Sequence, residues 1–378
     1  MELILRILRR VMWHACRLLP IQKNKIVFVS YYGRGYSDNP KYVAEALLES
    51  EAKIKYVWIA NDEKNAEVPD GFVTCPLNSF RYIYHMSTAK FWVDNARKYW
   101  CVKKKNQKYI QCWHGCFGLK KIEKDAFDKL EPDYQRMALL DASMTDLMVS
   151  NSKTLTKLYR DAFWYEDGEI LECGLPRNDR LFSYTDEDVK TIKERLAVPQ
   201  NKKIALYAPT FRKSQTLSVY GMNYNLVAEK LGERFGGEWI ILIRLHPNVF
   251  KLSNNIEFDN KTTFNASMYH DIQELYMISD LCMTDYSSVM FDFMLTERPC
   301  LLYASDVEEY KKERDFFITV DSLPFPLAEN NEEMALNILN FNEEEYNKKV
   351  KEFSDFHGFC DDGNASKKVA EWILNKIN

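Results

Sequence analysis

The sequence predicts an α/β protein made of two consecutive doubly wound domains. Short apolar runs alternate with helical segments along most of the chain, which is the pattern of parallel sheets covered by helices. A polar segment over residues 184–202 interrupts this alternation once, with a short helix and no strand, and the alternation then begins again. Two α/β units of similar size, facing each other across a cleft, therefore follow an N-terminal helix.

The composition bounds the class of protein. The chain has 378 residues, of which 46% are apolar and 28% charged, with a net charge of −4. It can bury a large core, and it lacks the block of like charges typical of proteins that coat nucleic acids. The spacing of its nine cysteines matches neither a metal site nor a secreted disulfide framework. We expect reduced thiols in a cytoplasmic protein, with no metal site and no nucleic-acid partner.

Residues 1–24 form a separate N-terminal segment. Its apolar residues recur at helical spacing, and Arg6, Arg9, Arg10 and Arg17 fall on the opposite side. Four arginines in such a short stretch argue against a membrane-spanning helix, and no cleavage site for a signal peptide follows. The pattern favours a basic amphipathic helix that lies on an anionic membrane surface. The alternative is a helix that packs its apolar face on the domain itself.

The first domain is predicted over residues 25–183 and the second over 184–378. The expected strands are short apolar runs, at 25–30, 54–60, 91–93, 109–113 and 147–150 in the first domain and at 204–207, 239–243, 281–284 and 300–303 in the second. Helices are expected from about Pro40, over 223–235, 272–279 and 288–295, and from about Ser366.

One candidate site follows the strand at 109–113. His114 lies at its end beside Gly115, and Lys120 follows a few residues later. A histidine has an unperturbed pKa near working pH, so His114 could act as a general base. A histidine that only hydrogen-bonds a loop is the alternative.

Anion-binding residues follow strands of the second domain. Arg244 and His246 come after the run at 239–243, and Pro247 fixes the turn beyond them. Thr284, Asp285, Ser287 and Ser288 lie where the strand at 281–284 runs into a helix, so free backbone N–H groups and hydroxyls could bind one phosphate. Plain helix capping by serine is compatible with this role.

Two further strand ends carry an arginine beside a rigid turn. Thr210 and Arg212 follow the run at 204–207, and Arg177 lies in the segment Gly174–Asp179. Each is a weak signal alone, but together the segments describe a cleft that binds anions. Walker-type, G-x-G-x-x-G and G-x-S-x-G motifs are all absent from the sequence, which argues against ATP hydrolysis, hydride transfer and a serine nucleophile.

The ordered set of these segments resembles the CDP-glycerol glycerophosphotransferase family, the primases and polymerases of teichoic acids and related capsular polymers. The matching segments are WHGCFGLKKIEKD, GLPRNDRLF, LYAPTFR, RLHP and the stretch from TDYSSVMFDF to ERDFF, together with SDNP near the start and DDGNAS near the end. They cover nearly the whole chain after the first helix. The sequence departs from the family at Cys116-Phe117-Gly118, which replaces a Thr-Pro pair.

The resemblance implies a GT-B architecture and a transfer of polyol phosphate from CDP-glycerol, or a relative such as CDP-ribitol, to a lipid-linked acceptor, with release of CMP. It implies His114 as the base and His246 as a group that holds the pyrophosphate. The predicted catalytic residues are thus His114 and His246. The predicted substrate-binding residues are Asp38, Lys120, Arg177, Thr210, Arg212, Arg244, Pro247, Thr284, Asp285, Ser287, Ser288 and Asp292.

Several alternatives stay open. A CMP-sialic-acid-dependent or nucleotide-sugar-dependent GT-B glycosyltransferase of capsule synthesis is the closest rival, and a non-catalytic binding module is another. The donor polyol, the acceptor, the length of the product and the oligomeric state are not determined by the sequence. No cofactor is obligatory, although Mg²⁺ could accompany the pyrophosphate. We expect a peripheral protein on the cytoplasmic face of the membrane.

Overall fold

The protein contains two compact units. The computed structural model describes residues 2–98, 100–117, 119, 121–210, 212, 221–245, 258–307 and 317–377. Unit 1 contains Met1–Gly115, Ile122–Asp179 and Phe359–Asn378, and unit 2 contains Cys116–Lys121 and Arg180–Gly358. The chain therefore passes between the units more than once.

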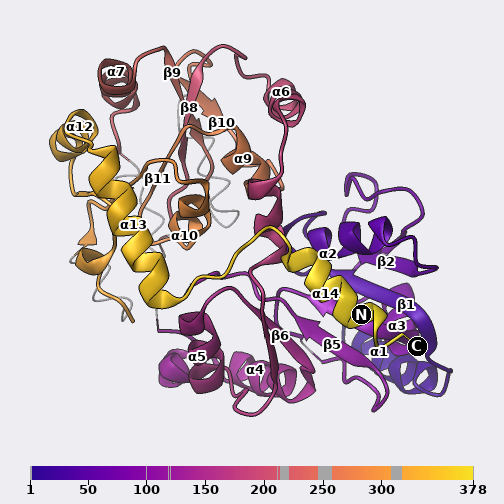
Figure 1. Ribbon diagram of the computed structural model, residues 1–378. Coiled ribbons are helices and arrows are strands. Elements are labelled where there is room, and N and C mark those ends of the chain that lie inside the picture. The colour runs from indigo at the N-terminus through magenta and orange to yellow at the C-terminus, as the bar shows by residue number, and fades with distance from the viewer. Residues whose placement is uncertain are drawn as a thin grey trace. The chain divides into compact units, whose positions relative to one another are not determined.

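Unit 1 is built on a seven-stranded parallel sheet (Figure 1). The strand order is β3-β2-β1-β4-β5-β6-β7. The strands are β1 (Gln22–Val29), β2 (Lys55–Ile59), β3 (Val73–Cys75), β4 (Ala89–Asp94), β5 (Lys108–Gln111), β6 (Leu147–Ser150) and β7 (Glu169–Glu172). The order reverses between β1 and β4, as in a doubly wound fold.

The helices of unit 1 cover this sheet. They are α1 (Glu2–Cys16), α2 (Asp38–Glu49), α3 (Phe80–Thr88), η1 (Glu123–Lys129), α4 (Pro132–Met144), α5 (Lys153–Ala162) and α14 (Ala365–Leu374). The last helix of the chain, α14, packs against α2 near the start of the chain (Figure 1). The 3₁₀ helix η2 (Pro176–Phe182) carries the chain from unit 1 into unit 2.

Unit 2 repeats the doubly wound pattern with six parallel strands in the order β10-β9-β8-β11-β12-β13. The strands are β8 (Lys203–Tyr207), β9 (Trp239–Ile243), β10 (Thr263–Asn265), β11 (Leu281–Thr284), β12 (Cys300–Tyr303) and β13 (Leu327–Ala328). The helices are α6 (Asp186–Arg195), α7 (Tyr224–Phe235), α9 (Ile272–Ile278), α10 (Val289–Phe293), η5 (Met294–Thr296), η6 (Val320–Ser322), α12 (Asn331–Leu339) and α13 (Glu343–His357).

The predicted α/β class and the two doubly wound sheets are confirmed. All nine predicted strands form, within a few residues of their expected bounds. The four strands that were not predicted are β3, β7, β10 and β13, and each is an edge strand of its sheet. They are short and only partly buried, so they lack the continuous apolar run that marks a central parallel strand.

The predicted domain bounds differ from the observed units at the C-terminus. Residues 184–378 were expected to form one domain, but Phe359–Asn378 belong to unit 1. Asp361 accepts from the backbone N–H of Leu175 at 2.9 Å, and Asp179 accepts from the backbone N–H groups of Ala365 and Ser366 at 3.0 and 2.7 Å. The Asp179 bonds cap the first turn of α14, and all three bonds fix the tail on unit 1.

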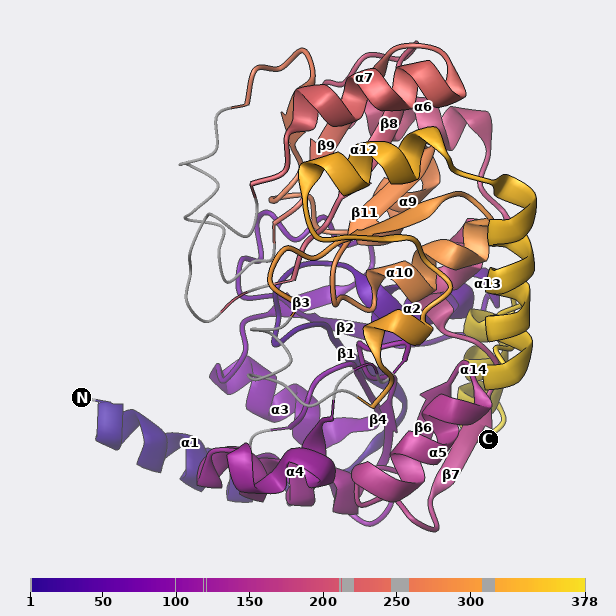
Figure 2. The ribbon, with the colours of Figure 1, turned by 90° about the vertical axis from the view of Figure 1, so that its left-hand side faces the viewer.

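Helix α1 is part of unit 1, and it presents two different faces. Trp13 and Cys16 are buried in the core cluster of this unit, where α1 packs on α3. Ile4, Ile7 and Val11 are 63%, 53% and 62% exposed. Trp13 comes about two and a half turns after Ile4, so the two side chains lie on opposite faces. Figure 2 shows the N-terminal end of α1 projecting beyond α3.

Candidate functional site

The strand order places a candidate site in each unit. In a doubly wound sheet, ligands bind beyond the carboxyl ends of the strands, at the point where the strand order reverses. That point lies between β1 and β4 in unit 1 and between β8 and β11 in unit 2. The predicted site residues that the structure describes follow strands at or near these two points or lie on the adjoining segments.

His114 lies just past β5 in unit 1, and its ring is fixed by one hydrogen bond. Its Nδ1 lies 2.8 Å from the backbone oxygen of Asn95, which follows β4. A carbonyl oxygen can only accept, so Nδ1 carries the proton and Nε2 of the neutral ring keeps a lone pair. The rings of Trp113 and Tyr31 flank it at centroid distances of 4.3 and 5.9 Å.

The surroundings of His114 favour its neutral form. Desolvation lowers the pKa of this histidine below its ordinary value of 6.5, and Arg177 acts in the same direction. The hydrogen bond to Asn95 and the carboxylates of Asp38 and Glu123 oppose this shift without reversing it. A neutral imidazole with an open Nε2 is the form that a general base requires.

Asp38 and Arg177 form a buried ion pair next to the backbone of His114, whose own side chain is exposed. The Asp38 carboxylate accepts from Arg177 Nη1 at 3.1 Å and from the Tyr31 hydroxyl at 2.7 Å. Arg177 Nη1 also donates to the backbone oxygen of His114 at 2.8 Å. Both charged side chains are less than 5% exposed. The structure thus brings these three predicted residues together: Arg177 holds the backbone of the histidine, and Asp38 holds Arg177.

Sequence reasoning missed two asparagines of this site. Asn39 Nδ2 donates to the backbone oxygen of Trp113 at 2.9 Å, and Asn39 Oδ1 accepts from the backbone N–H of Arg177 at 3.0 Å. Asn95 orients His114 through its backbone and accepts from the Tyr31 N–H through its side chain at 2.8 Å. Asn39 could have been found from the SDNP segment, whereas nothing in the local sequence marks Asn95.

In unit 2 the predicted residues after β8 and β11 form a buried network. Asp285 accepts from the backbone N–H and the hydroxyl of Thr210, at 2.9 and 2.5 Å. Arg212 pairs with Asp285 at 2.9 Å and with Asp306 at 2.6 Å. Thr284 donates its hydroxyl to the backbone oxygen of Ala208 at 2.7 Å. These groups support the two turns, and the substrate contacts predicted for them stay a prediction.

The serine pair lies beside this network. Ser287 and Ser288 are partly exposed just before α10, and the Ser288 side chain makes no capping hydrogen bond. Plain capping therefore does not occupy the Ser288 hydroxyl. Asp292 is buried on α10, and Arg244 is partly exposed after β9. Helix α10 has only five residues, so any dipole contribution to an anion site is small.

Three predicted residues, Lys120, His246 and Pro247, lie outside the described part of the chain. Their roles stay predictions.

The segment that departs from the family pattern packs inside unit 2. The Cys116 thiol donates to the backbone oxygen of Ser288 at 3.2 Å. The ring of Phe117 contacts those of Phe291 and His357 at centroid distances of 4.6 and 4.8 Å. Both side chains are buried. The two residues Cys116 and Phe117 of this departure from the family pattern therefore pack next to the serine pair.

The described residues contain neither a candidate metal site nor a membrane-spanning helix. No group of three or more His, Cys, Asp and Glu side chains there could hold a metal ion. None of the helices in those ranges has the length and apolarity needed to cross a bilayer.

Comparisons with known proteins agree with this architecture. The family model of CDP-glycerol:poly(glycerophosphate) glycerophosphotransferase matches residues 11–375. The chain is 34% identical over 372 residues to a teichoic acid poly(glycerol phosphate) polymerase of Bacillus spizizenii, covering 94% of this chain and 93% of that protein.

Two further relatives show the range of lengths and the shared fold. A polymerase of the same name from Staphylococcus epidermidis is 33% identical, with 94% of this chain and 51% of that protein covered, so the chain spans about half of its length. A solved structure of a variant of the wall teichoic acid polymerase TagF soaked with CDPG has a TM-score of 0.86 at 31% identity, covering 98% of this chain and 93% of that one. The chain belongs to the CDP-glycerol:poly(glycerophosphate) glycerophosphotransferase family.

Proposed function

We propose that this chain transfers a polyol phosphate from a CDP-polyol to a lipid-linked acceptor of the teichoic acid type and releases CMP. Glycerol phosphate is the first candidate, and ribitol phosphate is the second. Relatives at 33–34% identity carry names for glycerol phosphate polymerisation, which supports this order. The observation that carries the proposal is the fixed, neutral ring of His114 at the carboxyl edge of the unit 1 sheet.

The proposed reaction is a single displacement at phosphorus. Nε2 of His114 accepts the proton of the acceptor hydroxyl, and the hydroxyl oxygen attacks the phosphorus that carries the polyol. The bond between this phosphorus and the oxygen of CMP breaks, and a phosphodiester forms. Catalysis of this kind depends mainly on positioning and on stabilisation of charge. Arg244, His246, Ser287 and Ser288 would bind the phosphates of the donor.

The acceptor would be reached at the membrane surface. Ile4, Ile7, Leu8 and Val11 form an exposed apolar stripe on α1, between 47% and 63% exposed, and the exposed Arg6 and Arg10 lie on the same helix. An apolar stripe beside cationic side chains suits the interface of an anionic bilayer. We therefore propose a peripheral association of α1 with the cytoplasmic face of the membrane.

A screen of donors tests the proposed function. The full chain is incubated with a soluble analogue of the acceptor and with CDP-glycerol, CDP-ribitol, CMP-sialic acid or UDP-sugars, each with Mg²⁺ or with EDTA. We expect release of CMP and growth of the acceptor with a CDP-polyol, in EDTA as well as in Mg²⁺. Turnover only with CMP-sialic acid or a UDP-sugar would replace the proposal by a glycosyltransferase, and turnover only in Mg²⁺ would establish a metal requirement.

A further inference from the structure

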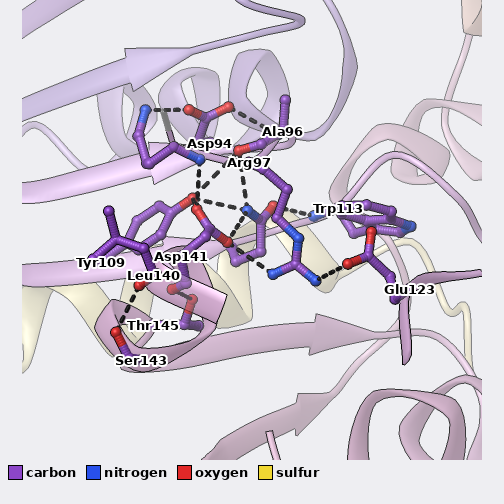
Figure 3. Close-up of polar contacts among 12 residues, drawn as sticks. Asp94, Ala96, Arg97, Tyr109, Trp113, Glu123, Leu140, Asp141, Ser143 and Thr145 are labelled. Carbon is purple, nitrogen blue, oxygen red and sulfur yellow. Dashed lines mark hydrogen bonds and ion pairs between the residues drawn. The ribbon is translucent and has the colours of Figure 1, made fainter. Parts of the chain in front are cut away.

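A buried network of charged groups lies next to Trp113, the residue that precedes His114 (Figure 3). The Arg97 guanidinium bridges two carboxylates, Asp141 at 2.9 Å and Glu123 at 2.9 Å. All three side chains are at most 2% exposed. Tyr109, which is fully buried, donates its hydroxyl to Asp141 at 2.8 Å.

This network is a poor stabiliser of the fold by itself. Removing three charged groups from water carries a large desolvation penalty, which the ion pairs offset only in part. Well-packed apolar side chains of similar volume often give the same stability or more. What the ionic network adds is directional bonding, since the planar guanidinium fixes the positions of both carboxylates.

The network reaches Trp113, the residue before His114, by two routes: one ends at its ring and the other at its backbone N–H. The Arg97 guanidinium lies over the ring of Trp113, 5.3 Å from its centroid. From Asp141 a chain of hydrogen bonds runs through Tyr109 to Gln111 Nε2 at 2.8 Å, and Gln111 Oε1 accepts from the Trp113 N–H at 2.9 Å. Both routes end at the residue before the proposed base.

Trp113 needs such support because of its backbone. Its φ is +51°, in the left-handed region that a non-glycine residue rarely adopts. A strained residue keeps such a conformation only where its surroundings hold it. The ring of His114 lies over that of Trp113 at 33°, so a relaxed Trp113 would move the imidazole as well.

Glu123 anchors the chain on the other side of the same loop. The segment Cys116–Lys121, which belongs to unit 2, separates Gly115 from Ile122 in unit 1. Glu123 also has a positive φ, of +55°, and it accepts from the Tyr134 hydroxyl as well as from Arg97. Arg97 therefore contacts both stems of this loop, through the Trp113 ring and through Glu123.

We propose that Arg97, Glu123 and Asp141 are positioning residues, which hold the strained Trp113 turn and thereby fix the orientation of the His114 ring. They do not touch the substrate. This inference rests on the proposed role of His114 as the base, and it adds three residues that act on the base only through Trp113 and the loop stems.

The test compares Glu123→Gln and Arg97→Lys with a matched control, Asp146→Asn. Glu123→Gln keeps the size of the side chain but sets an amide against the guanidinium, and Arg97→Lys keeps the charge but lacks the planar fork that fixes both carboxylates. Asp146 pairs with Lys103 and Lys108 just before β6, at the amino edge of the same sheet and away from His114. Asp146 also accepts from the backbone N–H of Tyr109 at 2.8 Å, a bond that the amide oxygen of asparagine can keep. The substitution therefore removes the charge from partly buried ion pairs of unit 1, while Arg97, Glu123 and Asp141 keep their partners.

Two readouts separate positioning from general stability. With a CDP-polyol and a soluble acceptor analogue, Glu123→Gln and Arg97→Lys should lower kcat on the order of 100-fold, the scale of a misplacement of about 1 Å, with donor KM nearly unchanged. In full-length protein labelled with ¹⁵N-histidine, the His114 signals should change from one fixed tautomer to an averaged pattern. Asp146→Asn should keep both the kcat and the fixed tautomer.

The ¹⁵N signals decide the matter even if the proposed reaction is wrong, because they need no turnover. A fixed His114 tautomer in folded Glu123→Gln and Arg97→Lys overturns the proposal. So does an equal loss of the fixed tautomer in Asp146→Asn, which would make the effect one of stability. If one of the two network variants does not fold, the other carries the test.

Discussion

His114 is the residue on which the proposed chemistry depends most directly. Its Nδ1 is held by the backbone of Asn95, and its Nε2 remains an acceptor. We predict that His114→Asn lowers kcat about 100-fold or more, the scale of a lost general base, while binding of a CDP-donor changes little. Steady-state kinetics with calorimetry of donor binding checks this. His14→Asn is the matched control, since His14 is exposed on α1, and near-normal turnover by His114→Asn would contradict the proposed base.

The pH dependence of the reaction follows from the same ring. Desolvation lowers the pKa of His114 below 6.5, so the neutral form persists to a more acidic pH than for a free histidine. We predict that the acid limb of kcat/KM has its midpoint below pH 6.5 and is absent from the residual activity of His114→Asn. A pH profile between about pH 4.5 and 8 measures it. A midpoint above pH 6.5 would contradict the lowered pKa.

Ser288 is the residue-scale test of the anion site in unit 2. Its hydroxyl is partly exposed and makes no capping bond. We predict that Ser288→Ala raises the Kd for CMP about tenfold, which corresponds to one hydrogen bond to a charged phosphate. Calorimetry with CMP measures this, and Ser143→Ala on α4 serves as a control. An unchanged Kd for Ser288→Ala would place the phosphates elsewhere.

At the scale of elements, one face of α1 packs in the core of unit 1 and the other is exposed. Because Trp13 and Cys16 belong to the core, removal of the helix would disturb unit 1. Substitution of the exposed stripe is the sharper test. We predict that Ile7→Glu with Val11→Glu abolishes sedimentation with phosphatidylglycerol vesicles and leaves the melting temperature nearly unchanged. Transfer to a lipid-anchored acceptor should slow more than transfer to a soluble one.

The control for this test is Leu336→Glu, which changes a side chain on α12 that is 56% exposed. It should sediment like the unmodified chain. Binding of the unmodified chain should weaken from low to physiological salt, because salt screens the attraction between the arginines and the anionic lipids. It should still persist, because salt does not screen the burial of the apolar stripe. Equal sedimentation of all variants would contradict the proposed role of the apolar stripe in membrane binding.

At the scale of the whole chain, the tail returns to unit 1 and packs tightly against Gly174. Gly174 has a φ of +90°, and an added Cβ would lie 2.9 Å from Cα of Asp361. Gly71 has the same φ with nothing within 4 Å. We predict that Gly174→Ala destabilises the protein by about 1–2 kcal/mol more than Gly71→Ala, since both add strain but only one adds a clash. Denaturant unfolding of both variants measures the difference, and equal losses would contradict tight docking of the tail.

The central strands could be predicted from the sequence because burial on both faces requires continuous apolar runs, as at Trp239–Ile243. The edge strands could not, because they are short and half-covered, and pairing with a neighbour defines them more than their residues do. The same distinction applies to the site. His114 was found because a histidine beside a glycine at a strand end is conspicuous, whereas Asn95 acts mainly through its backbone.

The sequence by itself determined the α/β class, the two doubly wound sheets and the family, since these depend on residue types and their order along the chain. It also led to His114 as the proposed base, which stays a prediction. Only the tertiary structure decided which partners those residues have. Arg212, which is predicted to bind a substrate, pairs with Asp285 and Asp306, and the C-terminal tail joins unit 1. Such pairings join residues about 70 to more than 180 positions apart. They cannot be predicted from the local sequence, because the packing of the sheets brings the partners together.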